Sequence, residues 1–193
     1  LALEASKEIP DSAATIAEGA YNAISAGISG TNEQVIEFVK TAGKAAVAGV
    51  SDTNTAVNAG TTVLNAYKLE ASESQKVFDT FFAGIKLGKT SFAEMSAGLA
   101  NVIPSASAAK VEFSEVSAVI AQMTSLGVPT AQATTQMRAA LIELQKPAGP
   151  LQKVLANVGL SAEEMRKSLA DEGLVATLQK VEKSASSMGL SLT

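Results

Sequence analysis

The sequence predicts an all-α protein of about ten short helices in a helix–turn–helix arrangement, bundle-like or solenoid-like, with no sheet. Three observations carry this prediction. Apolar residues recur at helical spacing along nearly the whole chain, capping residues and glycines punctuate it, and no stretch alternates apolar and polar residues between hairpin turns.

The expected helices are three or four turns long. The clearest buried faces, spaced i, i+3, i+4, i+7, are Phe78/Phe81/Phe82/Ile85, Val116/Val119/Ile120/Met123 and Met137/Ala140/Leu141/Leu144. The helices are expected at residues 11–28, 31–48, 52–68, 72–87 and 91–103, then, after a short turn near 105–109, at 113–126, 130–145, 150–158, 161–169 and 173–187.

Capping chemistry sets these boundaries. In a capping box a Ser or Thr oxygen accepts a free backbone N–H while a Glu or Gln three residues later reaches back; the candidates are Thr31/Gln34, Ser72/Gln75, Ser91/Glu94 and Ser161/Glu164. Glycines expected to end helices are Gly30, Gly49, Gly88, Gly127, Gly159 and Gly189. The remaining boundaries are expected at Pro104, Pro129, Pro147 and Pro150.

Three of these glycines, Gly49, Gly88 and Gly127, stand 39 residues apart, and each precedes a polar residue that can open the next helix. This spacing indicates a repeated helix–turn–helix unit. A chain with 14 glycines also produces some equal spacings by chance. We expect three regions: N-terminal helices with a small-residue packing face at 1–50, a central helical region at 51–147 and a C-terminal helical hairpin region at 148–193.

The first expected helix carries a ladder of small residues, Thr15, Gly19, Ala23 and Gly27, beside an apolar ridge of Ile16, Ala20, Ile24 and Ile28. Such ladders let two helix backbones approach closely, in membranes or outside them. Tight packing within a bundle or an oligomer is the favoured interpretation over a bilayer contact.

Composition narrows the function. Only 4% of residues are aromatic against 47% apolar, which predicts a thin core lined by alanine. Charged residues make up 18% and the mean hydropathy is +0.21, so we expect partner surfaces. The net charge of −4 is spread along the chain, and the only arginines are Arg138 and Arg166, a pattern that does not favour nucleic-acid binding.

The chain contains no Cys and no His, which removes disulfides, thiolate chemistry and the commonest catalytic base. It shows no signal peptide and no apolar run of about 18 residues. Because it begins at Leu1 rather than Met, we expect it to be an excerpt of a longer protein.

Four patterns invite a chemical interpretation, and a structural one is preferred for each. Residues 83–90 resemble a phosphate-binding loop, but the first glycine is misplaced and no strand precedes it. Ser107 and Lys110 match S-x-x-K without its partner motifs. The acidic pairs Glu163/Glu164 and Asp171/Glu172 are expected in first turns of helices. The phenylalanines at 78–82 are expected in the core. We therefore predict no catalytic, cofactor-binding or metal-binding residues, no cofactor and no enzymatic activity.

Three runs follow one another in the central part of the chain. They are Gly88-Lys89-Thr90-Ser91-Phe92-Ala93-Glu94-Met95 through Ala100-Asn101-Val102-Ile103-Pro104, then Val111–Val116, then Leu126-Gly127-Val128-Pro129 through Leu141. In this order they resemble the core of phage tail tape measure proteins, and the resemblance is densest from Ala56 to Pro147. It extends to Gly159-Leu160-Ser161 and to residues 173–178. It departs at residues 110–113, where the family pattern suggests a turn containing glycine.

The resemblance implies a structural role. Tape measure proteins lie in the lumen of the tail tube, scaffold its polymerisation, set tail length and leave ahead of the DNA at ejection. The implied localisation is the virion, after synthesis in the bacterial host cytoplasm. The implied partners are further copies of the chain, in trimers or hexamers, tail tube and tail tip or baseplate proteins, and the host membrane at ejection, with no specific nucleic acid.

A ruler requires a long helix, and this chain is interrupted by Gly or Pro every fifteen to twenty residues, as the helix boundaries above require. We therefore expect a compact or rearranging helical module of the larger protein. Two alternatives remain open: an α-solenoid protein-binding module built on the 39-residue unit, and a membrane-active helical bundle.

Overall fold

A computed structural model describes residues 1–157 and 159–187, and this part of the chain is helical without strands. The all-α prediction is confirmed. The helices are α1 (Ala2–Ala5), α2 (Ala13–Ser25), α3 (Asn32–Ala48), α4 (Thr53–Tyr67), the 3₁₀ turn η1 (Ala71–Glu73), α5 (Ser74–Leu87), α6 (Phe92–Ala108), α7 (Phe113–Ser125), α8 (Thr130–Gln145), α9 (Gly149–Asn157) and α10 (Ala162–Ser187).

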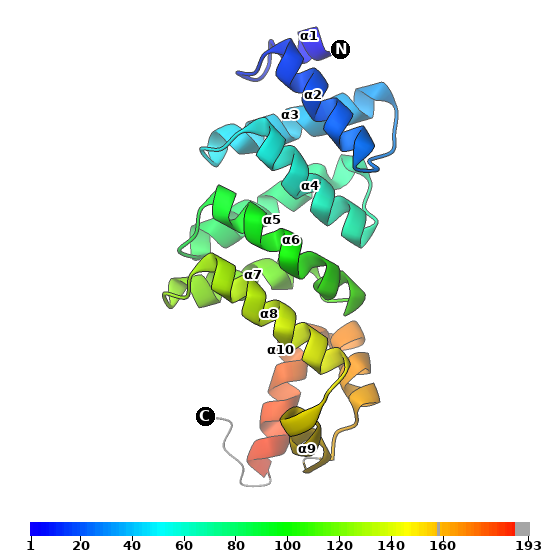
Figure 1. Cartoon of the computed structure of the whole chain (residues 1–193), viewed down its shortest axis with the longest axis vertical. Coiled ribbons are helices and arrows are strands. Elements are labelled where there is room, and N and C mark those ends of the chain that lie inside the picture. The colour runs from blue at the N-terminus through cyan, green and yellow to red at the C-terminus, as the bar shows by residue number, and fades with distance from the viewer. Residues whose placement is uncertain (158, 188–193) are drawn as a thin grey trace.

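The helices stack in two layers along the long axis of the molecule (Figure 1). The even layer consists of α2, α4, α6 and α8, each packed beside the next, and the odd layer consists of α3, α5 and α7. The helices of the two layers lie obliquely across the long axis, with the N-terminus at one end and α9 and α10 near the other. Of the two arrangements that the sequence left open, the chain adopts the solenoid-like one.

The predicted 39-residue unit is confirmed as a structural repeat. Gly49, Gly88 and Gly127 stand at the turns that join α3 to α4, α5 to α6 and α7 to α8. The N-caps of the four even helices, Ser12, Asp52, Ser91 and Pro129, are spaced 40, 39 and 38 residues apart. Positions counted from these N-caps are therefore equivalent from one repeat to the next.

Glycines let neighbouring helices approach closely enough to bury a core of small residues. A Cβ added to Gly84 in α5 would overlap Ser117 Oγ in α7, and one added to Gly98 in α6 would lie 2.8 Å from Thr134 Cγ2 in α8. Both contacts are shorter than van der Waals separation, so only glycine fits at these crossings. The small residues of the sequence thus let successive helices of the same layer pack closely.

A ladder of hydrogen bonds joins the C-terminal ends of successive helices. The last carbonyls of a helix lack an intrahelical partner, so buried ends need donors from elsewhere. Here a side chain near the end of each even helix donates to a carbonyl at the end of the even helix before it, and Arg166 near the start of α10 does the same for α8. The four rungs are Asn65 to Ala26, Ser107 to Ala66, Gln145 to Ser105 and Arg166 to Gln145.

The buried core extends along the solenoid, from Ala5 near the N-terminus to Val181 in α10. Its largest side chains are phenylalanines at the centre of the stack. The ring of Phe81 lies 5.5 Å from that of Phe92 and 5.4 Å from that of Phe113, measured between centroids. The core assignment of the phenylalanines at 78–82 is confirmed for Phe78 and Phe81, which are buried, while Phe82 packs at the edge. The three-region division of the chain stays a prediction.

Several helix starts are confirmed by their hydrogen bonds. The boxes at Thr31/Gln34, Ser91/Glu94 and Ser161/Glu164 each show both reciprocal bonds. The box predicted at Ser72/Gln75 is wrong. Ser72 lies within η1, and the Gln75 amide donates to Asp79 one turn later.

Two predicted helix ends are wrong. Pro104 does not end α6, which continues to Ala108. The carbonyl that Pro104 leaves without a donor belongs to Ala100, an exposed residue, so water can satisfy it. Helix α2 ends at Ser25 rather than 28, and Gly27, with φ of +95°, takes the left-handed conformation there in place of Gly30.

The turn between α6 and α7 contains no glycine, but one of its residues adopts the left-handed backbone conformation that glycine favours. Lys110, where the sequence departs from the tape measure pattern, adopts φ of 59°. The helix break is therefore present at the expected place although the residue carries a Cβ. The short helix α1 was not predicted, since its four residues are too few to show a helical pattern.

The C-terminal region contains α9 and the broken helix α10. Gly173 has φ of 86° and ψ of 178°, so α10 consists of two helical segments, as the sequence predicted, with the break at Gly173 itself. The amide of Leu174 donates to Glu115 Oε2 of α7 at 3.1 Å, and this bond caps the second segment. Residue 158, the expected end of the ninth helix, and Gly189 lie outside the described residues.

Candidate functional site

The pattern at residues 83–90 has no room for a phosphate. Gly84 is buried inside α5, and no strand precedes it in the described chain. The amide of Lys89 donates to Thr124 Oγ1 of α7 at 3.1 Å, and the hydroxyl of Thr130 donates to that of Thr90 at 2.7 Å. Donors that would cradle a phosphate are thus engaged in joining α5, α7 and α8. The preferred interpretation as a helix end is confirmed.

Ser107 and Lys110 do not form a nucleophile with its activating base. The Ser107 hydroxyl donates to the carbonyl of Ala66 and is a rung of the ladder described above. Lys110 is exposed in the turn after α6. The serine therefore holds two repeats together.

The two acidic pairs differ in their placement. Glu163 and Glu164 lie in the first turn of α10, as predicted, and the hydrogen bond from the backbone of Ser161 lowers the pKa of Glu164. The placement of Asp171 and Glu172 in a first turn was wrong. They precede the break at Gly173, where Glu172 pairs with Lys180 at 3.2 Å and the carboxylate of Glu115 occupies the capping position.

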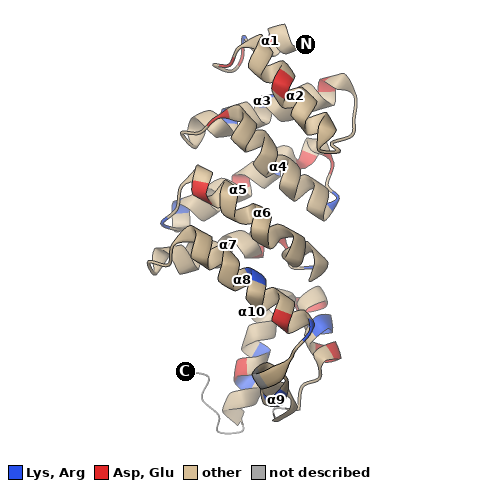
Figure 2. Cartoon of the chain, in the orientation of Figure 1, with Lys and Arg blue, Asp and Glu red and all other residues tan. Residues whose placement is uncertain are grey.

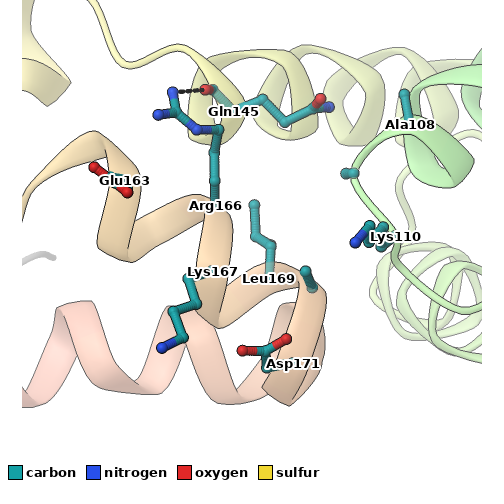
Figure 3. Close-up of a pocket in the computed structure, with 10 residues that line it drawn as sticks. Ala108, Lys110, Gln145, Glu163, Arg166, Lys167, Leu169 and Asp171 are labelled. Atoms are coloured by element: carbon teal, nitrogen blue, oxygen red, sulfur yellow. Dashed lines mark hydrogen bonds between the residues drawn. The ribbon is translucent and has the colours of Figure 1, made fainter.

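A hollow of about 500 Å³ lies where the solenoid meets α10. One wall is the turn after α6, and the other is the first segment of α10 (Figure 3). Arg166 extends from α10 to the backbone oxygen of Gln145, at 3.3 Å, while Lys110 stands on the opposite wall. Lys167 and Asp171 lie along the α10 side.

The lining of this hollow is mostly polar. It combines three cationic and two acidic side chains with alanines, Gln145 and Leu169. No group of metal-ligating side chains occurs in residues 1–157 and 159–187. The sequence predicted no site here, because the hollow arises from the junction of segments about 60 residues apart in the chain, which periodicity does not reveal.

The even layer presents a nearly uncharged face (Figure 2). Within the bounds of α2, α4, α6 and α8 the charged residues are Glu18, Glu94, Arg138 and Glu143, and α4 has none. Exposed positions on α4 and α6 include Asn58, Ala97 and Asn101. Such a face allows close approach of another surface with little desolvation of charge.

Two members of the small-residue ladder of the first helix face the interior of the chain. A Cβ on Gly19 would lie 3.0 Å from Val39 of α3 and 3.6 Å from Val57 of α4, and Ala23 is fully buried. The favoured interpretation, tight packing between helices, is confirmed for these two, whereas Gly27 lies beyond the end of α2 and is exposed. No helix among the described residues combines the length and the apolar character needed to cross a bilayer.

Tyr67 makes a further contact between repeats that the sequence did not predict. The hydroxyl of Tyr67 at the end of α4 donates to the carbonyl of Val111 at 2.8 Å. Burial, followed by the negative charges of Glu112 and Glu115, raises the pKa of Tyr67 well above its usual range. The phenol therefore stays a donor. The signal for these contacts was present in the sequence as polar residues about 40 positions apart at helix ends, namely Asn65, Ser105 or Ser107, and Gln145.

Comparison with known proteins adds two matches. A family model described as phage-related minor tail protein matches residues 1–191. A probable tape measure protein of Clostridium phage phiCD119 is 38% identical over 146 residues, which cover 75% of this chain and 16% of that protein. No solved structure matches the chain.

Proposed function

Because this chain belongs to the phage-related minor tail protein family, we propose that it is a folded helical module of a tail tape measure protein. The family match covers nearly all of the chain, and a structural role in a phage tail follows from it. The aligned part covers 16% of the tape measure relative, so the properties of a whole tape measure protein enter here as proposals.

The observation that carries the proposal is that the helices lie across the long axis of the molecule (Figure 1). Neighbouring helices pack about 8–10 Å apart, and each repeat uses about 39 residues, so the solenoid advances about 0.25 Å per residue. A continuous helix advances about 1.5 Å per residue. This module therefore contributes about one sixth of the length that a ruler helix of the same size would contribute.

In this proposal the length of the tail is set by other segments of the protein, and this module supports tube assembly and genome ejection. It resides in the lumen of the tail tube within the virion. Its contacts are with further copies of itself, as trimers or hexamers, and with tail tube and tail tip or baseplate proteins. The host membrane is a further contact at ejection, and no specific nucleic acid is involved.

The even layer supplies the surface for these contacts. It is nearly free of charge, and on α4 and α6 its exposed residues include the short Asn58, Ala97 and Asn101, so copies of the chain can approach one another through it without burying unpaired ions. The odd helices α3 and α5 carry more charges, among them Glu37, Lys44 and Asp79. We therefore place self-association and tail contacts on the even layer.

Removal of the module from the full protein, by an in-frame deletion of residues 1–187 in the phage genome, tests the proposal. The expected result is loss of tail assembly or of infectivity. Tails that assemble and are shortened in proportion to the 187 deleted residues, by about 280 Å at 1.5 Å per residue, would contradict it.

A second candidate function is a protein-binding module that acts as a monomer, and the solenoid architecture favours it. The mass of the chain in solution at two concentrations distinguishes the two functions. Self-association that grows with concentration supports the tail module, and a monomer at both concentrations supports the binding module. Leakage of dye from liposomes on addition of the chain would favour the membrane-active alternative instead.

A further inference from the structure

A shallow apolar groove lies at the N-terminal end of the solenoid, away from the hollow near α10. It measures about 360 Å³ and is bounded by α1, α2 and the start of α3. Its lining contains no charged side chain and includes Leu1, Tyr21, Ile24, Val35 and Ile36. Tyr21 is 70% exposed and Ile24 is 54% exposed, which is unusual for large apolar side chains on a packed helix.

The repeat register shows what this groove corresponds to. Ile24 is the twelfth residue after the N-cap of α2, and the twelfth residues of α4, α6 and α8 are Leu64, Ile103 and Leu141. Those three side chains are completely buried, and each helix that carries one packs on the even helix of the preceding repeat. The exposed face of α2 is therefore equivalent to an inter-repeat interface with one side uncovered.

The odd layer shows which kind of helix would fill the groove. In the complete repeat, α3 covers α4, and the ring of Phe38 lies 3.0 Å from the position of a Cβ on Gly60. The residue of α2 equivalent to Gly60 is Ala20, which lines the groove. The helix that precedes α2 is α1, a single turn of four residues, whereas α3 has 17.

We propose that the groove is the seat of an amphipathic helix of the odd-layer type, joined to α1 on its N-terminal side in the same polypeptide. Continuity with the established repeat interface carries the proposal, because α1 matches only the last turn of α3 and the groove extends beyond it along α2. The uncharged lining requires an apolar buried face on the occupant, of the kind that Val35, Phe38 and Val39 give α3.

The absence of cysteine makes a direct test simple, since Ile24→Cys introduces the only thiol. The probe is an extension fused ahead of Leu1 that copies residues 31–43 of the chain. These residues precede the last turn of α3, and α1 corresponds to that last turn. The expected result is that this extension slows the reaction of the introduced thiol with a maleimide by at least about tenfold and raises the thermal midpoint.

Two controls separate docking from other effects. The same extension with glutamine in place of the copied Val35, Phe38 and Val39 is expected to leave the reaction of the thiol at position 24 unchanged. Leu87→Cys, at a position that is 70% exposed on α5 and remote from the groove, is expected to react at the same rate with and without the extension.

Equal reaction rates of the Ile24→Cys variant with the matched and the glutamine extensions would overturn the proposal. Protection of its thiol in the unextended chain, together with the mass of a dimer, would also overturn it, because the occupant would then be a second copy of the chain.

Discussion

The repeats from α2 to α8 and the C-terminal region of α9 and α10 hold together in different ways. In the repeats, each helix packs on equivalent helices through glycine crossings, and hydrogen bonds join the helix ends at regular spacing. In the C-terminal region, α10 bends at Gly173 and borders the hollow of about 500 Å³, and α9 makes its main helix contact with α10. The difference teaches that two regions that are both largely helical can differ in how regularly their helices stack.

The largest expected effect is at a glycine crossing within the repeats. Gly84→Val places methyl groups where Ser117 Oγ would already overlap the added Cβ, so α5 and α7 must separate. We expect the free energy of unfolding to fall by about 3 kcal/mol, measured by chemical denaturation. The control is Ala83→Val, at the adjacent exposed position, for which we expect a loss below about 1 kcal/mol. Equal losses for both variants would show that the crossing is not tight.

In the C-terminal region, Gly173→Ala is expected to act locally. Its φ of 86° is unfavourable for alanine, and the new Cβ would lie 2.6 Å from the carboxylate of Glu115. We expect a loss of about 1–2 kcal/mol. Hydrogen exchange should report the loss within residues 174–187, while α4 and α6 keep their protection. Equal loss of protection in α4 would contradict the difference between the two regions.

A hydrogen bond between helix ends should contribute less to the free energy of unfolding than a glycine crossing does. Ser107→Ala leaves the carbonyl of Ala66 without its donor, and we expect a loss of about 1 kcal/mol in the free energy of unfolding. Ser125→Ala is the matched control, since its hydroxyl donates to Gln122 within the same exposed helix end. The difference between the two variants isolates the contact between repeats, and a difference near zero would remove the ladder from the account.

The smallest expected effect concerns a helix start and its dependence on pH. The Thr55 hydroxyl, followed by the Thr55 amide, donates to Asp52 and lowers its pKa below the usual value. The stabilisation is thus complete above the ordinary carboxyl pKa of about 3.9 and is lost as the pH falls through the lower folded value.

Asp52→Asn keeps a capping oxygen but removes the charge that titrates. The denaturation midpoint of the unmodified chain should therefore fall more steeply below about pH 4 than that of the variant. Parallel curves for the two proteins would contradict the role given to Asp52.

Local patterns in the sequence predicted the helices well, and contacts between distant residues account for the errors. Thr31, Ser91 and Ser161 act within four residues, so their capping boxes could be recognised. Pro104 was expected to end a helix, but packing of Ile103 and Ala106 against the core continues α6 past it. The cap that Glu115 supplies to Leu174 joins residues 59 apart, and no local pattern indicates it.

The surfaces of the chain show the same limit of prediction from local sequence patterns. The repeat was visible as glycines 39 residues apart, and the resemblance to tape measure proteins indicated the family, which the comparisons then showed. The sequence did not show which faces remain open. Tyr21 and Ile24 carry the same apolar signal as Leu64, and only the stacking order decides that they are exposed.

The central claim is that this chain is a stacked module and not a ruler, and the length of tails that carry one extra repeat tests it most directly. Residues 52–90 are duplicated in frame within the full tape measure protein, and tail length is measured by electron microscopy. The account predicts tails that lengthen by at most about 10 Å, the advance of one stacked repeat. Tails longer by about 60 Å, the contribution of 39 residues at 1.5 Å each, would contradict it.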